Sequence, residues 1–299
     1  MRESELLRRI EARSADLAGR GPIVIGPGDD CAVLALPGST LATVDQLVAG
    51  RHFDPDSTSV EQIARKAMAR AVSDIAAMGG APSVALAAGC LPEGYPHADR
   101  LCQCLARSAR ELGCPLVGGD IAMGPGPLVL TITVLGEAHP ERGPVTRDAA
   151  RPGDALYVTG AIGGSLESGR HLSFSPRLAE GQWLCHALGP RLHAMIDLSD
   201  GLGRDAGRIA QSSLVRIVIE APAIPLHADA GGWRDAIDDG EDYELLFTAD
   251  PGAVLLARCP ATGTLITRIG RVEEGSGCIV RSPESGGLEV GELGWDHGP

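Results

Sequence analysis

The sequence predicts an α+β fold divided into two domains, and three observations support this prediction. The chain has 299 residues, which is enough for two domains that each bury a core. Both halves alternate short apolar strand patterns with longer helical ones, in the shared order strand, Gly/Asp turn, helix, strand. A proline- and charge-rich stretch, EAHPERGPVTRDAARP at 137–152, separates the halves. We therefore expect one domain over 1–138 and a second over 139–299.

The composition restricts the classes of partner. The formal net charge is −13 and the sequence pI is near 5.0, which argues against binding to nucleic acid or an anionic membrane surface. No apolar run approaches the about 18 residues that span a bilayer, and the charged N-terminus lacks the apolar core of a signal peptide. The eight cysteines form no Cys-x-x-Cys pair. We therefore expect reduced thiols, no zinc site and a cytoplasmic location.

The first half contains an amphipathic helix, a set of short strands and two longer helices. The helix pattern is expected over 4–18, and the strands at 31–36 and 41–47 are expected to pair with each other. Ser59 precedes an alanine-rich helix over 60–78 that ends at Gly79-Gly80, and a further helix covers 98–112. The remaining strands are expected at 23–25, 83–90, 115–117 and 128–136.

The second half repeats this alternation. Helix patterns cover 176–188 and 203–212. Strand patterns are found at 155–159, 194–198, 215–219 and 243–248, followed by alternating short strands over 264–290. Polar Gly/Asp-containing loops precede the second helix and the strand at 243–248, and loops of this kind often carry functional residues.

Aspartates recur where apolar stretches end or are interrupted. Asp29 and Asp30 follow a glycine- and proline-rich turn in GPGDDCAV, a pair that by itself is compatible with a solvated turn. Single aspartates stand in similar settings at Asp45, Asp74, Asp120, Asp197 and Asp200. Hard oxygen ligands that converge from several strand ends are suited to Mg²⁺ bound together with a polyphosphate. The repeated setting therefore predicts a carboxylate cluster that binds metal.

Other polar residues allow two interpretations each. His52, between a glycine turn and an aromatic residue, is compatible with a surface or capping role or with ligand binding. Gly118-Gly119 before Asp120 is typical of a turn, although paired glycines also let backbone N–H groups approach phosphate. The acidic run at 238–242 is either an exposed loop or a source of a substrate-facing carboxylate. Lys66 is the single lysine, so no Walker P-loop is present.

Several motifs together identify a family. They are GPGDDCAVL, TVDQLVAGRHF, SDIAAMG, VGGD, TRDAARPGDALYVTG, AMIDLSDGL and GEDYELLFT. Their order and spacing resemble those of thiamine-monophosphate kinases over nearly the whole chain. Single motifs are shared with aminoimidazole ribonucleotide synthetase and selenophosphate synthetase. The combination of SDIAAMG, GEDYELLFT and a terminal Gly-aromatic-Asp-His is more specific to the kinase.

The resemblance implies an activity and an assembly. The family phosphorylates thiamine monophosphate with ATP and several Mg²⁺ ions, and the product is thiamine diphosphate. Each of its two α+β domains has a mixed or antiparallel sheet with helices packed on it. The N-terminal sheet completes a barrel across a homodimer. No nucleic acid or membrane partner is implied.

The resemblance also implies roles for individual residues. It assigns metal binding to Asp30, Thr43, Val44, Asp45, Asp74, Asp120, Asp197 and Asp200, with Asp29 beside them in a less defined role. It assigns ATP contacts to Gly119, Asp120, Arg147 and Ser199. It assigns contacts with the thiamine substrate to His52, Glu241 and Trp295. No catalytic side chain beyond the metal ligands is implied, because the acceptor phosphate is already ionised at neutral pH.

Some positions depart from the family pattern. The family usually has threonine at Val44, asparagine at Ala71, threonine at Ile121 and aspartate at Gly164; at Val44 a backbone carbonyl is the remaining possible metal ligand. These losses leave two alternatives open: another ATP-dependent enzyme of the same superfamily, or a catalytically silent protein that binds nucleotide or thiamine phosphate. Because every metal-binding aspartate is present, an active kinase is the main prediction.

Overall fold

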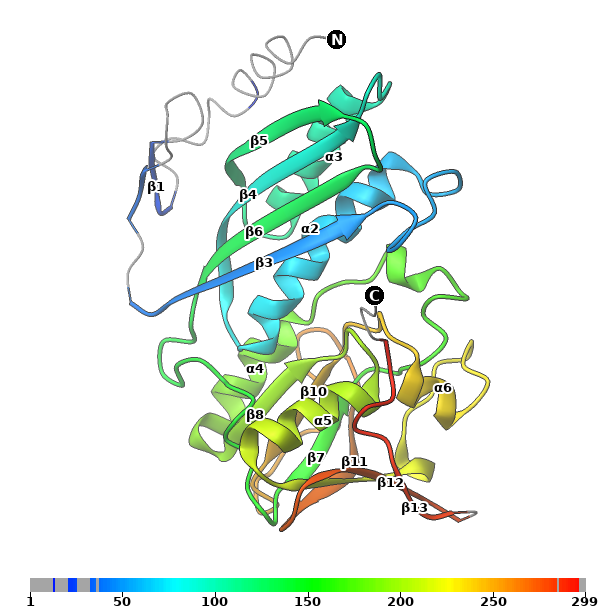
Figure 1. The fold of residues 1–299 in the computed structure, drawn as a ribbon. Helices are drawn as coiled ribbons and strands as arrows, with labels where there is room; N and C mark the ends of the chain where they lie inside the picture. The colour runs from blue at the N-terminus through cyan, green and yellow to red at the C-terminus, as the bar shows by residue number, and fades with distance from the viewer. Residues whose placement is uncertain (1–12, 14–20, 26–32, 36–37, 284, 296–299) are drawn as a thin grey trace. The chain divides into compact units, whose positions relative to one another are not determined.

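The computed structural model describes residues 13, 21–25, 33–35, 38–283 and 285–295, which form a mixed α+β fold (Figure 1). It contains a four-stranded sheet, a seven-stranded sheet and a two-stranded ribbon. One compact unit comprises the chain up to Ile75 together with Ala81–Ala138, and the other comprises Ala76–Gly80 and His139–Pro299. The helix predicted over 4–18 and the turn that carries Asp29 and Asp30 lie outside the described residues.

The first unit has a four-stranded sheet in the order β3-β6-β4-β5. Its strands are β3 (Thr40–Val48), β4 (Ala81–Pro92), β5 (Leu116–Gly124) and β6 (Val129–Glu137). β6 runs antiparallel to β3 and β4, whereas β4 and β5 are parallel. The helices α2 (Val60–Ala77) and α3 (Ala98–Glu111) lie on the same side of this sheet (Figure 1). Among the described residues, no helix covers the other side.

The predicted pairing of the second and third strands is wrong. β2 (Val33–Leu34) pairs with β1 (Ile23–Ile25) in a small antiparallel ribbon, and β3 pairs with β6 instead. The β3–β6 ladder joins two strands of 9 residues each. A long strand forms more backbone hydrogen bonds with an equally long partner rich in β-branched residues than with a short strand.

Helix α2 is fixed by a capping box and by close packing. The hydroxyl of Ser59 accepts the N–H of Gln62 at 3.3 Å, and the Gln62 side chain accepts the N–H of Ser59 at 3.1 Å. Ala64, Ala67 and Ala71 are at most 1% exposed. The small side chains therefore let neighbouring elements approach the helix closely.

The predicted end of the strand before Gly118-Gly119-Asp120 is wrong, because β5 continues through these residues. Gly119 pairs with Ala87 of β4, and a Cβ atom on Gly119 would lie 2.0 Å from the Ala87 carbonyl oxygen. The glycine therefore permits a close contact between two strands, whereas the sequence pattern predicted a turn.

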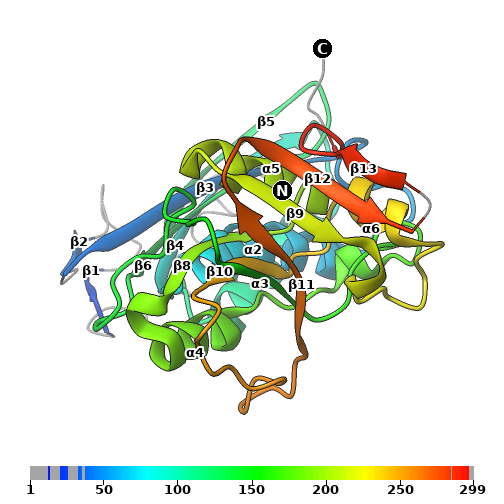
Figure 2. The ribbon, with the colours of Figure 1, turned by 90° about the horizontal axis from the view of Figure 1, so that it is seen from below.

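The second unit has a seven-stranded sheet in the order β13-β12-β9-β11-β7-β10-β8. Its strands are β7 (Ala155–Thr159), β8 (Leu192–Asp197), β9 (Arg216–Glu220), β10 (Leu245–Ala249), β11 (Ile266–Glu273), β12 (Gly277–Ser282) and β13 (Ser285–Glu289). Only β9 and β12 are parallel among these paired strands, and Figure 2 shows β13, β12 and β9 side by side.

Hydrophobic cores lie on both faces of this sheet. Ile196 and Leu246 pack with α5 (Leu202–Ser213) and α6 (Trp233–Asp238). Their chain neighbours Met195 and Leu245 pack instead with α4 (Leu178–Leu188). Successive strand side chains point to opposite faces, so this alternation places helices on both sides of the sheet.

Three short 3₁₀ turns complete the second unit: η1 (Arg170–Leu172), η2 (Gly189–Arg191) and η3 (Ala221–Ala223). Among the described helices, none has both the length and the apolar character needed to cross a membrane. Every cysteine in the described part of the chain is a free thiol.

Candidate functional site

In the first unit, predicted metal-binding residues gather where β3 faces α2. Thr43 and Asp45 alternate with Val44 along β3, so their side chains share one face of the sheet. The Thr43 hydroxyl donates a hydrogen bond to the carboxylate of Asp74 on α2. Arg70 lies 3.8 Å from the Asp45 carboxylate and donates to the Gln46 carbonyl at 3.1 Å. Hard oxygen donors and one guanidinium therefore share this face.

Two predicted ligands of the first unit lie apart from this group. The Val44 side chain is 61% exposed and points to the opposite face of β3, so only its backbone could bind a metal on the Asp45 side. Asp120 is exposed on β5, at the other edge of the sheet from Asp45.

The sheet register gives the scale of the separation between Asp45 and Asp120. Asp45 pairs with Ile132, Ile132 with Ala87, and Ala87 with Gly119, the neighbour of Asp120. Three strand spacings amount to about 14 Å. Two oxygens that bind one Mg²⁺ lie within about 4 Å of each other. Aspartate side chains are too short to close this gap within one sheet.

His52 caps the loop that follows β3. Its Nδ1 accepts the backbone N–H of Val48 at 2.9 Å, so the ring nitrogen that bears the proton in the neutral form is Nε2. Lys66, which is fully buried, donates to the His52 carbonyl at 2.7 Å. The structure thus supports a capping role for Nδ1, and the predicted substrate contact remains a prediction.

In the second unit, the end of β8 and the start of α5 carry the predicted metal and nucleotide residues. Asp197 is the last residue of β8 and is 3% exposed. Ser199 and Asp200 follow it, and their backbone N–H groups both donate to Asp205 Oδ2 at 3.0 Å. Arg208 forms ion pairs with Asp200 and Asp205. This arrangement holds the Ser199-Asp200 turn in one conformation.

Asp205 is a functional candidate that the sequence analysis missed. It is fully buried, and this burial raises its pKa to about 6 against the opposing effect of Arg208. Its position in the first turn of α5, three residues before Arg208, was the available sequence signal. The signal is weak, because the same spacing is common on solvent-exposed helices.

Glu241 and Trp295 meet this turn although they are distant in the sequence. The N–H of Glu241 donates to the Ser199 carbonyl at 2.8 Å, and the N–H of Trp295 donates to the Asp200 carbonyl at 2.9 Å. A Cβ atom on Gly294 would lie 2.3 Å from the Asp200 carbonyl oxygen, so this approach requires glycine. Trp295 is 45% exposed.

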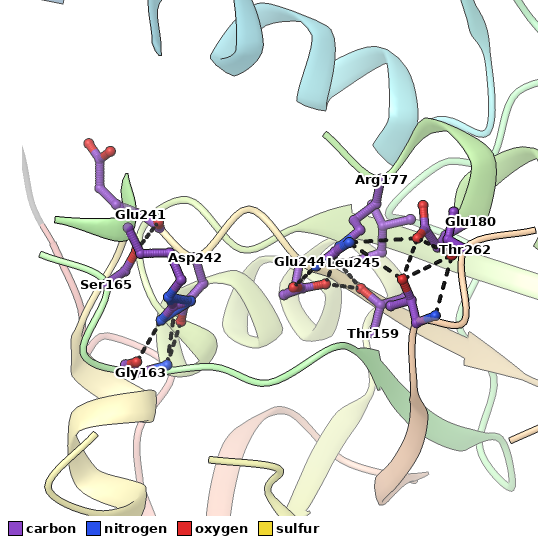
Figure 3. Close-up of polar contacts among 12 residues, drawn as sticks. Thr159, Gly163, Ser165, Arg177, Glu180, Glu241, Asp242, Glu244, Leu245 and Thr262 are labelled. Atoms are coloured by element: carbon purple, nitrogen blue, oxygen red, sulfur yellow. Dashed lines mark hydrogen bonds and ion pairs between the residues drawn. The ribbon is translucent and has the colours of Figure 1, made fainter. Parts of the chain in front are cut away.

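Buried carboxylates support the segment around Glu241 (Figure 3). Asp242 accepts the Gly163 N–H and lies 3.1 Å from Arg170, and burial raises its pKa to about 7. Glu244 forms an ion pair with Arg177 and accepts the Thr159 hydroxyl at 2.6 Å, and burial raises its pKa. These bonds fix Asp242 and Glu244, the chain neighbours of Tyr243, just before β10 begins at Leu245.

Arg147 is not brought to Ser199. Its carbonyl accepts the hydroxyl of Ser213 at 2.8 Å, at the C-terminal end of α5, whereas Ser199 precedes the N-terminal end. The helix between them rises by about 17 Å. Within the described ranges, no group of three or more His, Cys, Asp or Glu side chains has the arrangement of a metal site.

Comparisons with known proteins agree with this arrangement of sheets. Residues 28–138 match the family AIR synthase related protein, N-terminal domain. The solved structure of a thiamine-monophosphate kinase from Stenotrophomonas maltophilia K279a has 30% identity and a TM-score of 0.76, with 94% of this chain and 96% of that chain covered. Over residues 28–138 the protein is therefore similar to AIR synthase related N-terminal domains, and its fold is of the α+β class.

Two further similarities extend over nearly the full length. A thiamine-monophosphate kinase from Rhodopirellula baltica is 33% identical over 316 residues, which cover 99% of this chain and 97% of the relative. The structure of AaThiL complexed with AMPPCP and TMP is 29% identical with a TM-score of 0.71, and covers 97% of this chain and 98% of that one. The chain belongs to the thiamine-monophosphate kinase family, and it is a kinase by this membership.

Proposed function

We propose that this protein transfers the γ-phosphoryl group of ATP to the phosphate of thiamine monophosphate and thereby produces thiamine diphosphate. One observation carries the proposal. Glu241 and Trp295, expected to contact the thiamine substrate, are joined by backbone hydrogen bonds to the Ser199-Asp200 turn, expected to contact nucleotide and metal. Family membership over nearly the whole chain supports the same reaction.

The proposed chemistry depends on position and charge. The attacking oxygen belongs to an ionised phosphate, so no general base is required, and the main obstacle is repulsion between two anions. Thr43, Asp45 and Asp74 offer oxygen donors of the kind that Mg²⁺ prefers, so this donor set fits the metal. Bound Mg²⁺ would screen the phosphate charges. Asp45 and Asp74 of the first unit would hold it, and Asp30, Asp197 and Asp200 are further proposed metal ligands.

The remaining predicted residues fit different parts of an elongated nucleotide. Because α5 separates Arg147 from Ser199, we assign them to different ends of ATP. Gly119 and Asp120 are proposed ATP contacts on β5, and His52 a contact with the thiamine substrate. On this proposal the domain over 1–138 binds ATP and Mg²⁺, and the domain over 139–299 adds nucleotide, metal and substrate contacts. A cytoplasmic location remains part of the proposal.

We also propose a homodimer in which the four-stranded sheets of two copies complete a barrel. The face of the sheet opposite α2 and α3 carries exposed Val44, and no described helix covers it. The separation of Asp45 from Asp120 also supports a dimer. If both residues serve one metal, they must come from two copies, because within one sheet they lie at opposite edges and, by the strand register, on opposite faces.

Subunit mixing tests the dimer. Asp45→Asn and Asp120→Asn should each be inactive, and a refolded equal mixture should recover about a quarter of wild-type turnover, because half of the dimers then carry one intact site. Sedimentation as a monomer would contradict the dimer. A dimer whose mixture stays inactive would show that both residues act within one subunit or at separate sites.

The reaction itself is tested by chromatographic detection of thiamine diphosphate. Purified protein is incubated with ATP, Mg²⁺ and thiamine monophosphate, with and without EDTA. Asp30→Asn and Asp74→Asn are the control variants. We expect product from the wild type with Mg²⁺ only, and none from either variant.

Two outcomes would contradict the proposal. Tight binding of ATP or thiamine monophosphate without turnover at any Mg²⁺ concentration would indicate a silent binding protein. ATP consumption with another acceptor, and none with thiamine monophosphate, would indicate a different enzyme of the superfamily.

A further inference from the structure

The segment around Glu241 has an unusual backbone conformation. Glu241 has φ 67° and Tyr243 has φ 53°, so two non-glycine residues separated by one position are left-handed. This conformation is unfavourable for side chains with a Cβ atom, and it persists only where surrounding contacts enforce it. Such conformations cluster at functional sites, so the contacts that enforce this one are informative.

Backbone hydrogen bonds enforce the conformation from one side. The N–H of Glu241 donates to Ser199 and that of Tyr243 donates to Leu198, both at 2.8 Å. A Cβ atom on Gly240 would lie 2.6 Å from the Ser199 carbonyl oxygen. The loop therefore lies directly on the turn that follows β8.

The segment 165–174 enforces the conformation from the other side. Ser165 donates its hydroxyl to the Glu241 carbonyl at 2.7 Å. Arg170 on η1 donates to the Gly163 carbonyl at 2.7 Å and to Asp242 at 3.1 Å. Figure 3 shows the contacts of Ser165 with Glu241 and of Gly163 with Asp242, with the Glu241 carboxylate directed away from Asp242.

His171 of the same segment and Tyr243 both contact the Glu241 carboxylate. His171 Nδ1 lies 3.8 Å from Glu241 Oε2, and both side chains are mostly buried, at 12% and 15% exposure. The Tyr243 hydroxyl donates to the same oxygen at 3.3 Å. The Tyr243 ring stacks on Phe174 with centroids 3.8 Å apart and an angle of 9° between the planes. The stack fixes the direction of the hydroxyl.

We propose that His171 and Tyr243 are positioning residues that orient the Glu241 carboxylate toward the thiamine moiety of the substrate. The proposal rests on the proposed function, because it takes Glu241 as a substrate contact. The Tyr243 hydroxyl donates to Oε2 and His171 lies 3.8 Å from the same oxygen, so the two side chains restrict rotation of the carboxylate. Thiamine offers a cationic ring and an amino group, and both are attracted by a carboxylate held in a fixed orientation.

Calorimetry with thiamine monophosphate alone tests the proposal independently of turnover. The variants are His171→Asn, Tyr243→Phe and Glu241→Gln, with exposed His186→Asn of the same unit as matched control. We expect Kd to rise about tenfold for His171→Asn and about fivefold for Tyr243→Phe. In turnover, KM for the thiamine substrate should rise by similar factors while kcat and KM for ATP change less than about twofold.

A double-variant experiment distinguishes a positioning role of His171 from a purely structural one. In the Glu241→Gln background, His171→Asn should change Kd by less than about twofold, because its effect requires the carboxylate. Wild-type Kd in both single variants, or an equal His171→Asn effect in both backgrounds, would overturn the proposal. If circular dichroism shows that His171→Asn does not fold, His171→Gln, which has a longer side chain, replaces it. A wild type that binds thiamine monophosphate but makes no product contradicts the proposed function alone.

Discussion

The buried carboxylate of Asp242 makes a specific prediction about stability and pH. Burial raises its pKa from the ordinary value of 3.8 to about 7 in the folded protein. Between pH 5 and pH 7 the native carboxyl therefore keeps a proton that the unfolded chain has lost. A native state that binds more protons becomes less stable as the pH rises. The contribution of Asp242 is thus most favourable at low pH and declines until the pH passes about 7.

The size of the effect follows from the same shift. Well below the folded pKa, each pH unit lowers the free energy of unfolding by about 1.4 kcal/mol. The slope weakens as the native carboxyl ionises, so the loss from pH 5 to pH 7 is about 2 kcal/mol. Asp242→Asn does not titrate, yet its amide oxygen can still accept the Gly163 N–H. The variant should therefore lack this part of the pH dependence.

Urea unfolding followed by tryptophan fluorescence measures the difference. All three tryptophans, Trp183, Trp233 and Trp295, lie in the same unit as Asp242, so the signal reports the relevant unfolding. Asp238→Asn at an exposed position is the control, and its pH profile should parallel that of the wild type. Parallel profiles for wild type and Asp242→Asn would refute the reasoning, since they would mean that Asp242 is ionised in the native state at pH 5.

Three further predictions concern activity and strand contact. Asp74→Asn should abolish turnover without changing the circular dichroism spectrum, because the amide still accepts the Thr43 hydroxyl; wild-type turnover would remove Asp74 from the metal site. Trp295→Ala should raise KM for the thiamine substrate about 2- to 12-fold through loss of ring stacking, and an unchanged KM would exclude a contact. Gly119→Ala should lower the thermal unfolding temperature, because its Cβ would lie 2.0 Å from the Ala87 carbonyl oxygen; an unchanged temperature would show that β4 and β5 can separate without loss.

Local patterns located most helices and strands. Residues 155–159 were predicted as a strand and form β7, and the helix predicted over 203–212 forms α5 (Leu202–Ser213). These elements are readable because hydrophobic periodicity and the residues that start and stop helices act within a few positions. The Ser59 cap of α2 is an example, since its partner Gln62 is only three residues away.

Strand pairing was not readable in the same way. The predicted partner of β3 was its neighbour in the sequence, yet β3 pairs with β6, far along the chain. Likewise, Gly118 and Gly119 look like a turn until β4 is placed beside them. Strand pairing depends on competition among all available strands, so a short sequence segment does not determine which strands pair.

The same distinction applies to the candidate site. The sequence by itself determined the chemical types present: repeated aspartates after apolar stretches, a single lysine, and motifs shared with one kinase family. Only the tertiary structure decided which of them meet. It joined Ser199 to Glu241, separated Asp45 from Asp120 by the width of a sheet, and revealed the buried supports Asp205 and His171. The physical reason is that residue type sets charge and hydrogen-bonding capacity, whereas distance and burial, which decide how these act, arise from contacts between segments far apart in the chain.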